Sequence, residues 1–337
     1  MPYRATDRYI PRNTKQTPRE MENKMKAQNT LGIYNSAIAD RQSNTLHDLY
    51  IPDADKFAHY FPRTFAGGVT EYDMYTFALE HRMNILLFGE AGVGKTTSAE
   101  WIASKLGLPY AEIPSNSAMD YSQVVGTLLP NTETGILEWR DGTALRVIRE
   151  GGVLLIGEIN TLAKNVSQFL MSLLDDRRHV TIMENGGEVV QAHENLIIIA
   201  DMNPNYRGTS LLNEAWKDRF EIKVEFDYDR SIESKFIKSG ALLDLAYGMR
   251  QSSRGIDAKV EGSSSTIFDT PISPRILKTF EKVATKLNYD FAVSNMVNAF
   301  DIEERPSVKM MLEGAEYNIK SDLGLDTADI VTEHENA

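Results

Sequence analysis

The stretch "NILLFGEAGVGKTTSAEWIASKLG" runs from Asn84 to Gly107 and decides the fold. It opens with a short apolar run that is typical of a buried strand and closes with an amphipathic segment that is typical of a helix. Between them, Gly89–Thr96 matches the spacing G-x-x-x-x-G-K-[ST]. Glycines let backbone amides wrap around phosphate oxygens, and the start of a helix favours negative charge. The stretch therefore predicts a phosphate-binding loop.

The residues of this loop have separate expected roles. Lys95 is expected to reach the β- and γ-phosphates of a nucleotide, and Thr96 is expected to ligate Mg²⁺. A glycine-rich turn that binds nothing is the alternative, but the strand before the loop and the helix after it count against that alternative. The predicted nucleotide-binding residues are Gly89, Glu90, Ala91, Gly92, Val93, Gly94, Lys95, Thr96 and Thr97.

Short apolar segments alternate with helical ones through the first two thirds of the chain. Such alternation predicts a parallel sheet covered by helices on both faces. Residues 179–191 alternate around a Gly-Gly pair and predict a β-hairpin, whereas the segment that leads up to Arg140 is expected to be irregular. The expected strands are 84–88, near 110–113, 152–156, 195–200 and 221–226, and the expected helices of this part are 71–82, 96–107 and 163–176.

After Asp227 the pattern changes to helices only, at about 231–250, 273–286, 290–300 and 305–321. The chain is therefore expected to have four parts. They are a partly flexible N-terminal extension over 1–55, an α/β nucleotide-binding domain over 56–227, a helical domain over 228–325 and an acidic tail over 326–337.

Composition excludes several classes of protein. The chain has 337 residues with 42% hydrophobic and 25% charged side chains, which is ordinary for a globular protein. No window approaches 18 uninterrupted apolar residues, so no membrane span is expected, and the N-terminus lacks the apolar region of a secretory signal. Cysteine is absent, which excludes disulfides and thiolate metal sites, and the expected location is cytoplasmic.

Charge and histidine spacing narrow the partners further. A net charge of −12 argues against non-specific binding to nucleic acid. The six histidines show no metal-ligand spacing, so no bound metal is expected beyond the Mg²⁺ of a nucleotide. Residues 1–26 carry seven basic and three acidic side chains. This arm is expected to be solvated, and the alternative is an arm that docks on a neighbouring subunit or an acidic partner.

Hydrolysis requires a positioned water and stabilisation of charge as well as a phosphate cradle. Glu158 follows a predicted strand at its carboxyl end, where α/β sheets place their sites, and it is the candidate to orient water. Asn203 follows the next apolar strand and is the candidate to hold that water or the γ-phosphate. Arg219 is the candidate to reach the γ-phosphate of a neighbouring subunit. Arg275, at a predicted helix start in the second domain, is the candidate to contact the same nucleotide and couple the helical domain to it. Each arginine taken alone is more simply a surface charge, but their order and spacing argue for a shared role.

In these motifs the chain resembles an AAA+ ATPase of the MoxR type, within the dynein-related group, over about residues 60–290. The Walker A motif is "GEAGVGKT" and the Walker B motif is "LLIGEIN", while Asn203 takes the place of sensor 1, Arg219 of the arginine finger and Arg275 of sensor 2. The stretch "NPNYRGTSLLNEAWKDRF" is close to the pattern N-P-x-Y-x-G…A…D-R-F of that family. The resemblance implies an AAA+ P-loop NTPase core with a parallel five-stranded sheet, a small all-α lid domain, and ATP and Mg²⁺ as cofactors.

The resemblance also implies partners. Similar proteins include activators of rubisco and of nitric-oxide reductase, gas-vesicle ATPases and the ATPase subunit of cobaltochelatase. They act as hexameric rings, often with a von Willebrand factor A-domain partner, and remodel a client protein or assist metal insertion. The stretch "GTLLPNTETGILEWRDGTALRVIREGG" resembles the segment before the Walker B motif of that family, and this segment holds the helix-2 insert. The 179–191 hairpin corresponds to the pre-sensor-1 insert, and in that family both inserts face the central pore or the partner.

The chain departs from the family pattern at two positions. Gly157 stands where the Walker B aspartate is expected, and Asp201 stands two residues before Asn203, where relatives often have threonine or serine. The resemblance places these two strands side by side, so our hypothesis is that Asp201 takes over the contact to the waters of the metal. Thr96 and Asp201 are then the predicted metal residues. The alternatives are a weakened site with slow hydrolysis, in which Asp201 is a local turn acid, and an engineered change.

Three functions remain open from the sequence. The first is a ring-forming ATPase that remodels a client protein. The second is the GTP-dependent motor of a restriction-type system, which would usually need a basic DNA-binding domain or partner. The third is a nucleotide-gated scaffold that binds ATP but hydrolyses it weakly.

Overall fold

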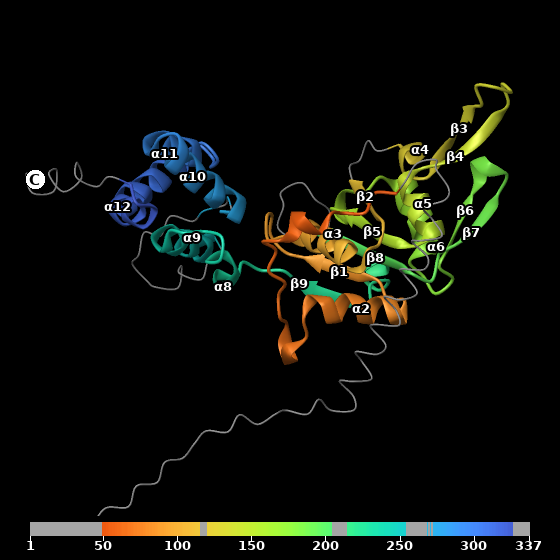
Figure 1. Cartoon of the computed structure of the whole chain (residues 1–337), viewed down its shortest axis with the longest axis horizontal. Coiled ribbons are helices and arrows are strands. Elements are labelled where there is room, and N and C mark those ends of the chain that lie inside the picture. Colours follow the sequence, from red (N-terminus) through yellow and green to blue (C-terminus); the bar gives the residue numbers. More distant parts are fainter. Residues whose placement is uncertain are drawn as a thin grey trace, which may run out of the picture. The chain divides into compact units, whose positions relative to one another are not determined.

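A computed structural model describes residues 49–114, 120–203, 214–253, 268, 270 and 272–325. The basic arm, most of the "NPNYRGTSLLN" stretch and the acidic tail lie outside these residues. A parallel five-stranded sheet in the order β2-β5-β8-β1-β9 lies at the centre of the α/β part (Figure 1). Its strands are β1 (Ile85–Phe88), β2 (Tyr110–Pro114), β5 (Gly152–Gly157), β8 (Leu196–Met202) and β9 (Ile222–Glu225). The predicted fold class and its strands are confirmed.

The sheet is covered on both faces, as its residues require. Every residue of β5 is buried, and so are the first six of β8, which leaves neither face of the central strands in water. The helix that follows the phosphate loop is α3 (Lys95–Leu106), and it ends at Gly107 in a left-handed conformation with φ 63°. The other helices of this part with at least eight residues are α2 (Glu71–His81), α5 (Thr143–Glu150) and α6 (Lys164–Leu173).

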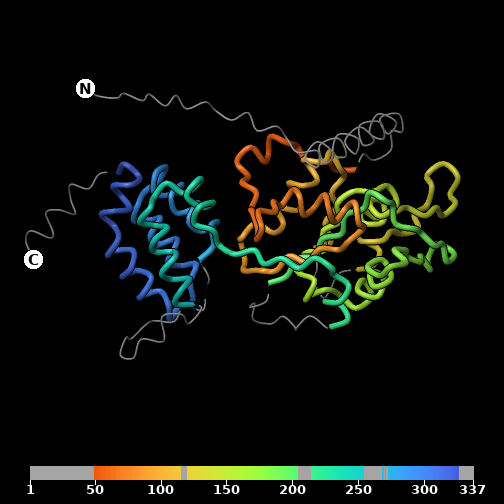
Figure 2. The backbone as a smooth tube through the Cα atoms, turned by 90° about the horizontal axis from the view of Figure 1, so that it is seen from below, coloured from red at the N-terminus to blue at the C-terminus, as the bar shows by residue number. Residues whose placement is uncertain are grey.

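Two antiparallel hairpins extend side by side from the α/β part, as both Figure 1 and Figure 2 show. One is β6 (His179–Ile182) with β7 (Glu188–Gln191), and this predicted hairpin is confirmed. The other is β3 (Gly126–Pro130) with β4 (Leu137–Asp141), where the prediction of an irregular segment is wrong. Its apolar residues are consecutive and exposed, so the sequence lacks the alternation that marks a half-buried strand.

The C-terminal part consists of helices around a core of its own. They are α8 (Arg230–Glu233), α9 (Gly240–Ser253), α10 (Pro274–Lys286), α11 (Tyr289–Val297) and α12 (Arg305–Leu323). Leu242, Leu277 and Leu312 are fully buried in that core. The single helix predicted over 231–250 is wrong, because the chain breaks between α8 and α9. The carboxylate of Glu281 on α10 accepts the amides of Lys238 and Ser239, each at 2.8 Å, and so holds this break.

The whole segment from Leu49 to Ala337 groups as one compact unit. Within it, the buried side chains of the sheet and those of the C-terminal helices form separate clusters. The domain boundaries given above stay predictions. Among the helices of the described residues, none is long and apolar enough to cross a membrane.

Candidate nucleotide-binding site

The predicted phosphate loop connects the end of β1 to the start of α3. The amide of Gly89 donates to the carbonyl of Met202 at 3.2 Å, which ties the loop to the end of β8. A Cβ atom at Gly89 would lie 2.0 Å from the carbonyl oxygen of Phe226, so no larger residue fits there. Gly92 and Gly94 have φ angles of 79° and 96°, a conformation that L side chains rarely adopt. The three glycines are therefore required by the path of the loop.

Lys95 lies inside the loop rather than in solvent. Its Nζ donates to the carbonyls of Gly89 at 2.8 Å and Glu90 at 3.0 Å, and the residue is only 8% exposed. Burial lowers the pKa of the ammonium group, and the nearby carboxylates of Asp201 and Glu158 oppose that shift. A cation held in this position is suited to bind the anionic phosphates of a nucleotide.

Asp201 joins two of the predicted site residues. Its Oδ2 accepts a hydrogen bond from Oγ1 of Thr96 at 3.4 Å, and its Oδ1 accepts one from the backbone amide of Glu158 at 2.6 Å. The residue is 5% exposed, and burial raises the pKa of its carboxyl group, while the hydrogen bond from Glu158 and the charge of Lys95 oppose the shift. Glu158 itself has φ 47°, and its side chain is exposed.

The remaining predicted residue at this edge of the sheet is Asn203. Its carbonyl oxygen accepts a hydrogen bond from Nδ2 of Asn160 at 3.3 Å, so it lies close to the turn that begins at Glu158. The structure thus brings together Lys95, Thr96, Glu158, Asp201 and the backbone of Asn203 at the carboxyl ends of the strands, where α/β sheets place their sites.

Beside the loop is a cleft of 480 Å³. Its wall includes Gly92 and Gly94 from the loop, Thr97 from the first turn of α3 and Arg275 from the start of α10. Arg275 is exposed and lies within reach of the same cleft, as a side chain that contacts the nucleotide must. A loop that only glycine can follow, a buried cation and an adjoining cleft together fit a bound nucleotide. The hydroxyl of Thr96 and the carboxylate of Asp201 supply oxygen atoms, which Mg²⁺ prefers.

Two residues at the loop were missed in the sequence. Arg63 donates from its guanidinium to the carbonyl of Val93, and it stacks over the ring of Phe226 at 4.4 Å. Tyr228 donates from its hydroxyl to the carbonyl of Ala91 at 3.0 Å. Both lie outside any motif, 30 and 137 residues from their partners, and only the folded chain brings them to the loop.

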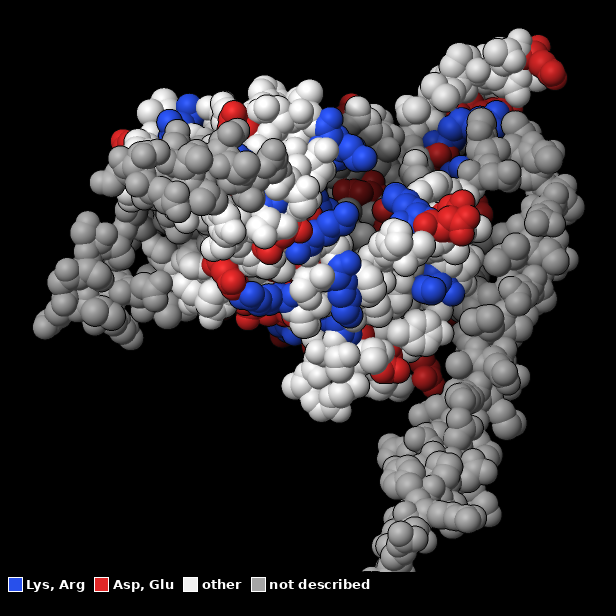
Figure 3. Space-filling view, turned by 60° about the vertical axis from the view of Figure 1, so that its left-hand side comes forward, with Lys and Arg blue, Asp and Glu red and all other residues white. Residues whose placement is uncertain are grey.

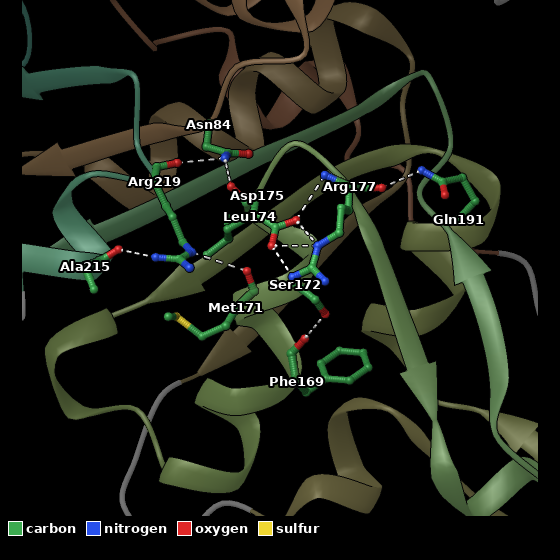
Figure 4. Close-up of polar contacts among 10 residues, drawn as sticks. All are labelled: Asn84, Phe169, Met171, Ser172, Leu174, Asp175, Arg177, Gln191, Ala215 and Arg219. Carbon is green, nitrogen blue, oxygen red and sulfur yellow. Dashed lines mark hydrogen bonds and ion pairs between the residues drawn. The ribbon is translucent and has the colours of Figure 1, made fainter.

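Arg219 is not brought to the site of its own chain, and Figure 4 shows the contacts that it makes instead. Its guanidinium donates to the carbonyl of Ala215 at 2.6 Å and to that of Met171 at 3.4 Å. Its own carbonyl accepts from the side chain of Asn84 at 2.8 Å. Because Asn84 precedes β1 and the phosphate loop follows it, Arg219 lies at the opposite end of the strand, roughly 16 Å from the loop at the usual rise of a strand.

Charges of both signs are mixed on the surface that Figure 3 shows, where Lys and Arg side chains stand beside Asp and Glu. The cleft has the same character. Lys56, Arg63, Arg275 and Lys278 line it together with Glu100, Asp229 and Glu233.

Residues 84–220 match the family described as AAA domain (dynein-related subfamily). An uncharacterized protein of Staphylococcus haemolyticus is 34% identical over 68% of this chain and 89% of its own length. CbbQ of Hydrogenophilus thermoluteolus is 26% identical over 73% of this chain and 90% of its own. NorQ of Paracoccus denitrificans is 26% identical over 61% of this chain and 75% of its own.

Other matches are partial. The chain covers 3% of the length of midasin from Giardia intestinalis, at 30% identity, and 62% of an uncharacterized protein of Staphylococcus epidermidis, at 35% identity. Among solved structures, a RuvB mutant of Thermotoga maritima is 18% identical over 76% of this chain and 81% of its own, with a TM-score of 0.40. The family model matches the chain, and the chain covers most of the length of CbbQ, NorQ and the Staphylococcus haemolyticus protein. The chain therefore belongs to the MoxR-type AAA+ ATPases of the dynein-related subfamily.

Proposed function

We propose that this protein binds ATP with Mg²⁺, hydrolyses it in a ring of identical subunits, and uses the reaction to remodel a client protein. One observation carries the proposal most directly. Lys95 lies buried in a glycine loop, beside the contact between Thr96 and Asp201 and the amide of Glu158. The family indicates an ATPase, and this arrangement supplies the groups that such a reaction needs.

Each of these groups has a role in the proposed reaction. Lys95 exchanges the carbonyls of Gly89 and Glu90 for phosphate oxygens. Thr96 holds Mg²⁺, which neutralises charge on the phosphates when it is bound. Glu158 is exposed at the end of β5, so its carboxylate is free to orient a water molecule and accept its proton. Asn203 and Arg275 complete the proposed set within one chain.

Nucleotide binding is tested first. Lys95→Ala removes the cation inside the loop, so we expect the protein to lose retention of labelled ATP in a filter assay. Lys105→Ala is the matched control, because Lys105 lies in the last turn of the same helix and is exposed. Equal retention by the two variants would show that the nucleotide site lies elsewhere.

We place Arg219 in the site of a neighbouring subunit. Its position at the far end of β1 excludes a direct contact in its own chain without a large movement, and a finger supplied in trans is worth roughly 10³–10⁵ in rate. We expect Arg219→Ala to bind ATP but hydrolyse it poorly, whereas Arg177→Ala, at a nearby exposed arginine, retains activity. Mixing Arg219→Ala with Lys95→Ala should restore part of the turnover. Turnover that is independent of protein concentration, with no rescue on mixing, would exclude shared sites.

The two hairpins are the proposed client surface. Ile136 and Leu137 on the first and Met183 and Val189 on the second are all at least 60% exposed. Such a concentration of exposed apolar side chains is typical of an interaction site. A 700 Å³ groove, lined by both hairpins and by α6, lies beside them. A von Willebrand factor A-domain protein is the partner that the family suggests.

The client is sought by co-purification with the native protein in the presence of ATPγS. A variant with Ile136→Ser and Leu137→Ser tests the proposed surface, because it alters only the surface of the first hairpin. We expect this variant to bind ATP as the parent does and to lose the co-purified partner. A partner retained at the parental level would place the client surface elsewhere.

A second candidate function is a nucleotide-gated scaffold with weak hydrolysis. Gly157 favours it, because this residue stands where the Walker B aspartate is expected. Turnover measured at saturating ATP and Mg²⁺ separates it from the first. A turnover that stays negligible with a bound client would favour the scaffold. The cytoplasmic location expected from the sequence stays a prediction.

A further inference from the structure

We propose that Asp201 is the magnesium-positioning carboxylate of this site, moved from β5 to the neighbouring strand β8, and that it also holds the backbone of Glu158. The carboxylate that is missing at Gly157 is then supplied by Asp201, so the two departures from the family pattern are linked. The inference rests on the proposed nucleotide site and specifies which residues of this chain serve its metal.

The strand order places the carboxylate where this role requires it. β8 lies between β1 and β5 in the sheet. Leu87 pairs with Asp201 across the first boundary, and Ile156 pairs with Ala200 across the second. Asp201, the last residue but one of β8, therefore lies between the phosphate loop, which follows β1, and Gly157, which ends β5.

The two oxygens of Asp201 have different partners. Oδ2 accepts from the hydroxyl of Thr96, the loop residue expected to ligate Mg²⁺, at 3.4 Å. Oδ1 accepts from the amide of Glu158 at 2.6 Å. A single buried carboxylate thus contacts both the proposed metal ligand and the proposed base. Residues that orient the ligands of a metal in this way tune its affinity.

The hydrogen bond to Glu158 has a further consequence. Glu158 has φ 47° and ψ 52°, a left-handed conformation that residues other than glycine seldom adopt. The bond from its amide to Asp201 helps to hold that conformation and so sets the direction in which the Glu158 side chain leaves the sheet. Asp201 is a positioning residue for the base as well as for the metal.

The surroundings of Gly157 disfavour an aspartate there. A Cβ atom at 157 would lie 3.3 Å from Oε1 of Glu112 and 4.0 Å from Oδ1 of Asp201. An aspartate at this position would add a third carboxylate between two that are already present, and like charges at such distances disfavour ionisation. Glycine at 157 leaves the space that Asp201 uses.

The test measures magnesium dependence of nucleotide binding, apart from hydrolysis. Affinity for a fluorescent ATP analogue is titrated in EDTA and in increasing Mg²⁺, for the parent and for Asp201→Asn, which preserves the shape of the side chain. We expect Asp201→Asn to keep its affinity in EDTA and to need about 10–100-fold more Mg²⁺ for half-saturation. Binding of Mn²⁺ in the presence of the nucleotide, followed by electron paramagnetic resonance, should weaken in parallel.

Two further variants make the test specific. Gly157→Asp alone should weaken binding of Mg²⁺ because it crowds carboxylates, whereas Gly157→Asp combined with Asp201→Thr should return the Mg²⁺ requirement toward that of the parent. Glu138→Gln is the matched control, since Glu138 is a carboxylate on β4 that pairs with Arg140 there and not with the residues of the site. It should leave the Mg²⁺ requirement unchanged.

The possible failures are distinguishable. If the parent binds the analogue in a Mg²⁺-dependent way and Asp201→Asn shows the same dependence, Asp201 does not position the metal. The proposed nucleotide site is then unaffected. An unrescued double variant, in a protein whose melting temperature matches that of the parent, also overturns the proposed role of Asp201. If the parent binds no nucleotide in either condition, the proposed function fails and the inference fails with it.

Discussion

Glu71 is a fully buried carboxylate that joins three segments around the phosphate loop. It accepts hydrogen bonds from the backbone of Arg63 at 2.9 Å, from Tyr60 at 2.5 Å and from Ser98 on α3 at 2.8 Å. The guanidinium of Arg63 lies 3.3 Å away and completes a buried ion pair. Because Arg63 also donates to the carbonyl of Val93, this one charge network supports the loop.

At the scale of the residue, we expect Arg63→Met to lower the free energy of unfolding by about 3–5 kcal/mol, because it leaves the carboxylate of Glu71 buried without its cation. Urea denaturation followed by circular dichroism measures the change. Lys56→Met is the control, since Lys56 is 53% exposed in its pair with Glu100 and such pairs are worth about 1 kcal/mol or less. Similar losses in the two variants would contradict this account of Glu71.

At the scale of the element, one arginine connects the two hairpins. Arg149, in the last turn of α5, donates from Nε to Asp141 at the end of β4 at 2.7 Å. Its two terminal nitrogens donate to both oxygens of Glu188 at the start of β7, at 2.7 and 2.9 Å. A bidentate pair of this kind restricts geometry as well as adding energy. Since α5 leads directly into β5, which ends just before Glu158, the hairpins are attached to the helix that precedes the strand of the proposed base.

We expect Arg149→Met to broaden the distribution of distances between the hairpins. The chain contains no cysteine, so spin labels attached to Ile136→Cys and Val189→Cys report on the two hairpins without background. Pulsed electron paramagnetic resonance measures the distribution. Arg146→Met is the matched control on the same helix, because Arg146 pairs at 3.9 Å with Glu150 of that helix. An unchanged width in Arg149→Met would show that other contacts hold the hairpins.

The same connection has a predictable pH dependence. The hydrogen bond from Arg149 lowers the pKa of Glu188 below its ordinary value of 4.5. A carboxyl group with a lowered pKa in the folded state stabilises that state above its ordinary pKa and loses the effect as the pH falls through the lowered value. The labelled parent should therefore keep a narrow distribution down to about pH 4.5 and broaden below it. The Arg149→Met variant should be equally broad throughout this range, and a pH-dependent narrowing in it would contradict the assignment.

At the scale of the whole molecule, Tyr228 links the phosphate loop to the C-terminal helices. Its hydroxyl donates to the carbonyl of Ala91, and the guanidinium of Arg250 on α9 lies 3.7 Å from the centre of its ring. Arg250 is in turn held by a buried bidentate pair with Glu233, with both bonds at 2.8 Å. The loop is therefore connected to the second core through a short series of contacts.

We expect bound Mg-ATP to slow hydrogen exchange in α9 to α12 as well as in α3. A ligand at 100 times its Kd stabilises the folded state by about 2.7 kcal/mol, which is enough to be detected. Tyr228→Phe removes the bond to Ala91, and protection should then be confined to α3. Tyr247→Phe, at an exposed tyrosine of α9, should behave as the parent does. Equal protection of the helices in both variants would indicate that the nucleotide is linked to them by another route.

The sequence predicted local features well and longer-range ones poorly. The strands of the sheet and the phosphate loop were predictable because apolar runs and glycine spacing are properties of neighbouring residues. The β3–β4 hairpin was not, because its exposed apolar residues do not alternate. The break between α8 and α9 depends on Glu281, more than 40 residues away, and so has no local signal.

The sequence by itself determined the class of fold, the loop and the set of candidate residues. Only the tertiary structure decided which of the candidate residues come into contact. Thr96 and Asp201 are 105 residues apart and come into contact because β8 lies beside β1 in register. Arg219 faces the opposite end of the same sheet, which no motif shows. The physical reason is that a local pattern specifies each strand, whereas strand order and register, which place side chains across the sheet, result from packing of the whole chain.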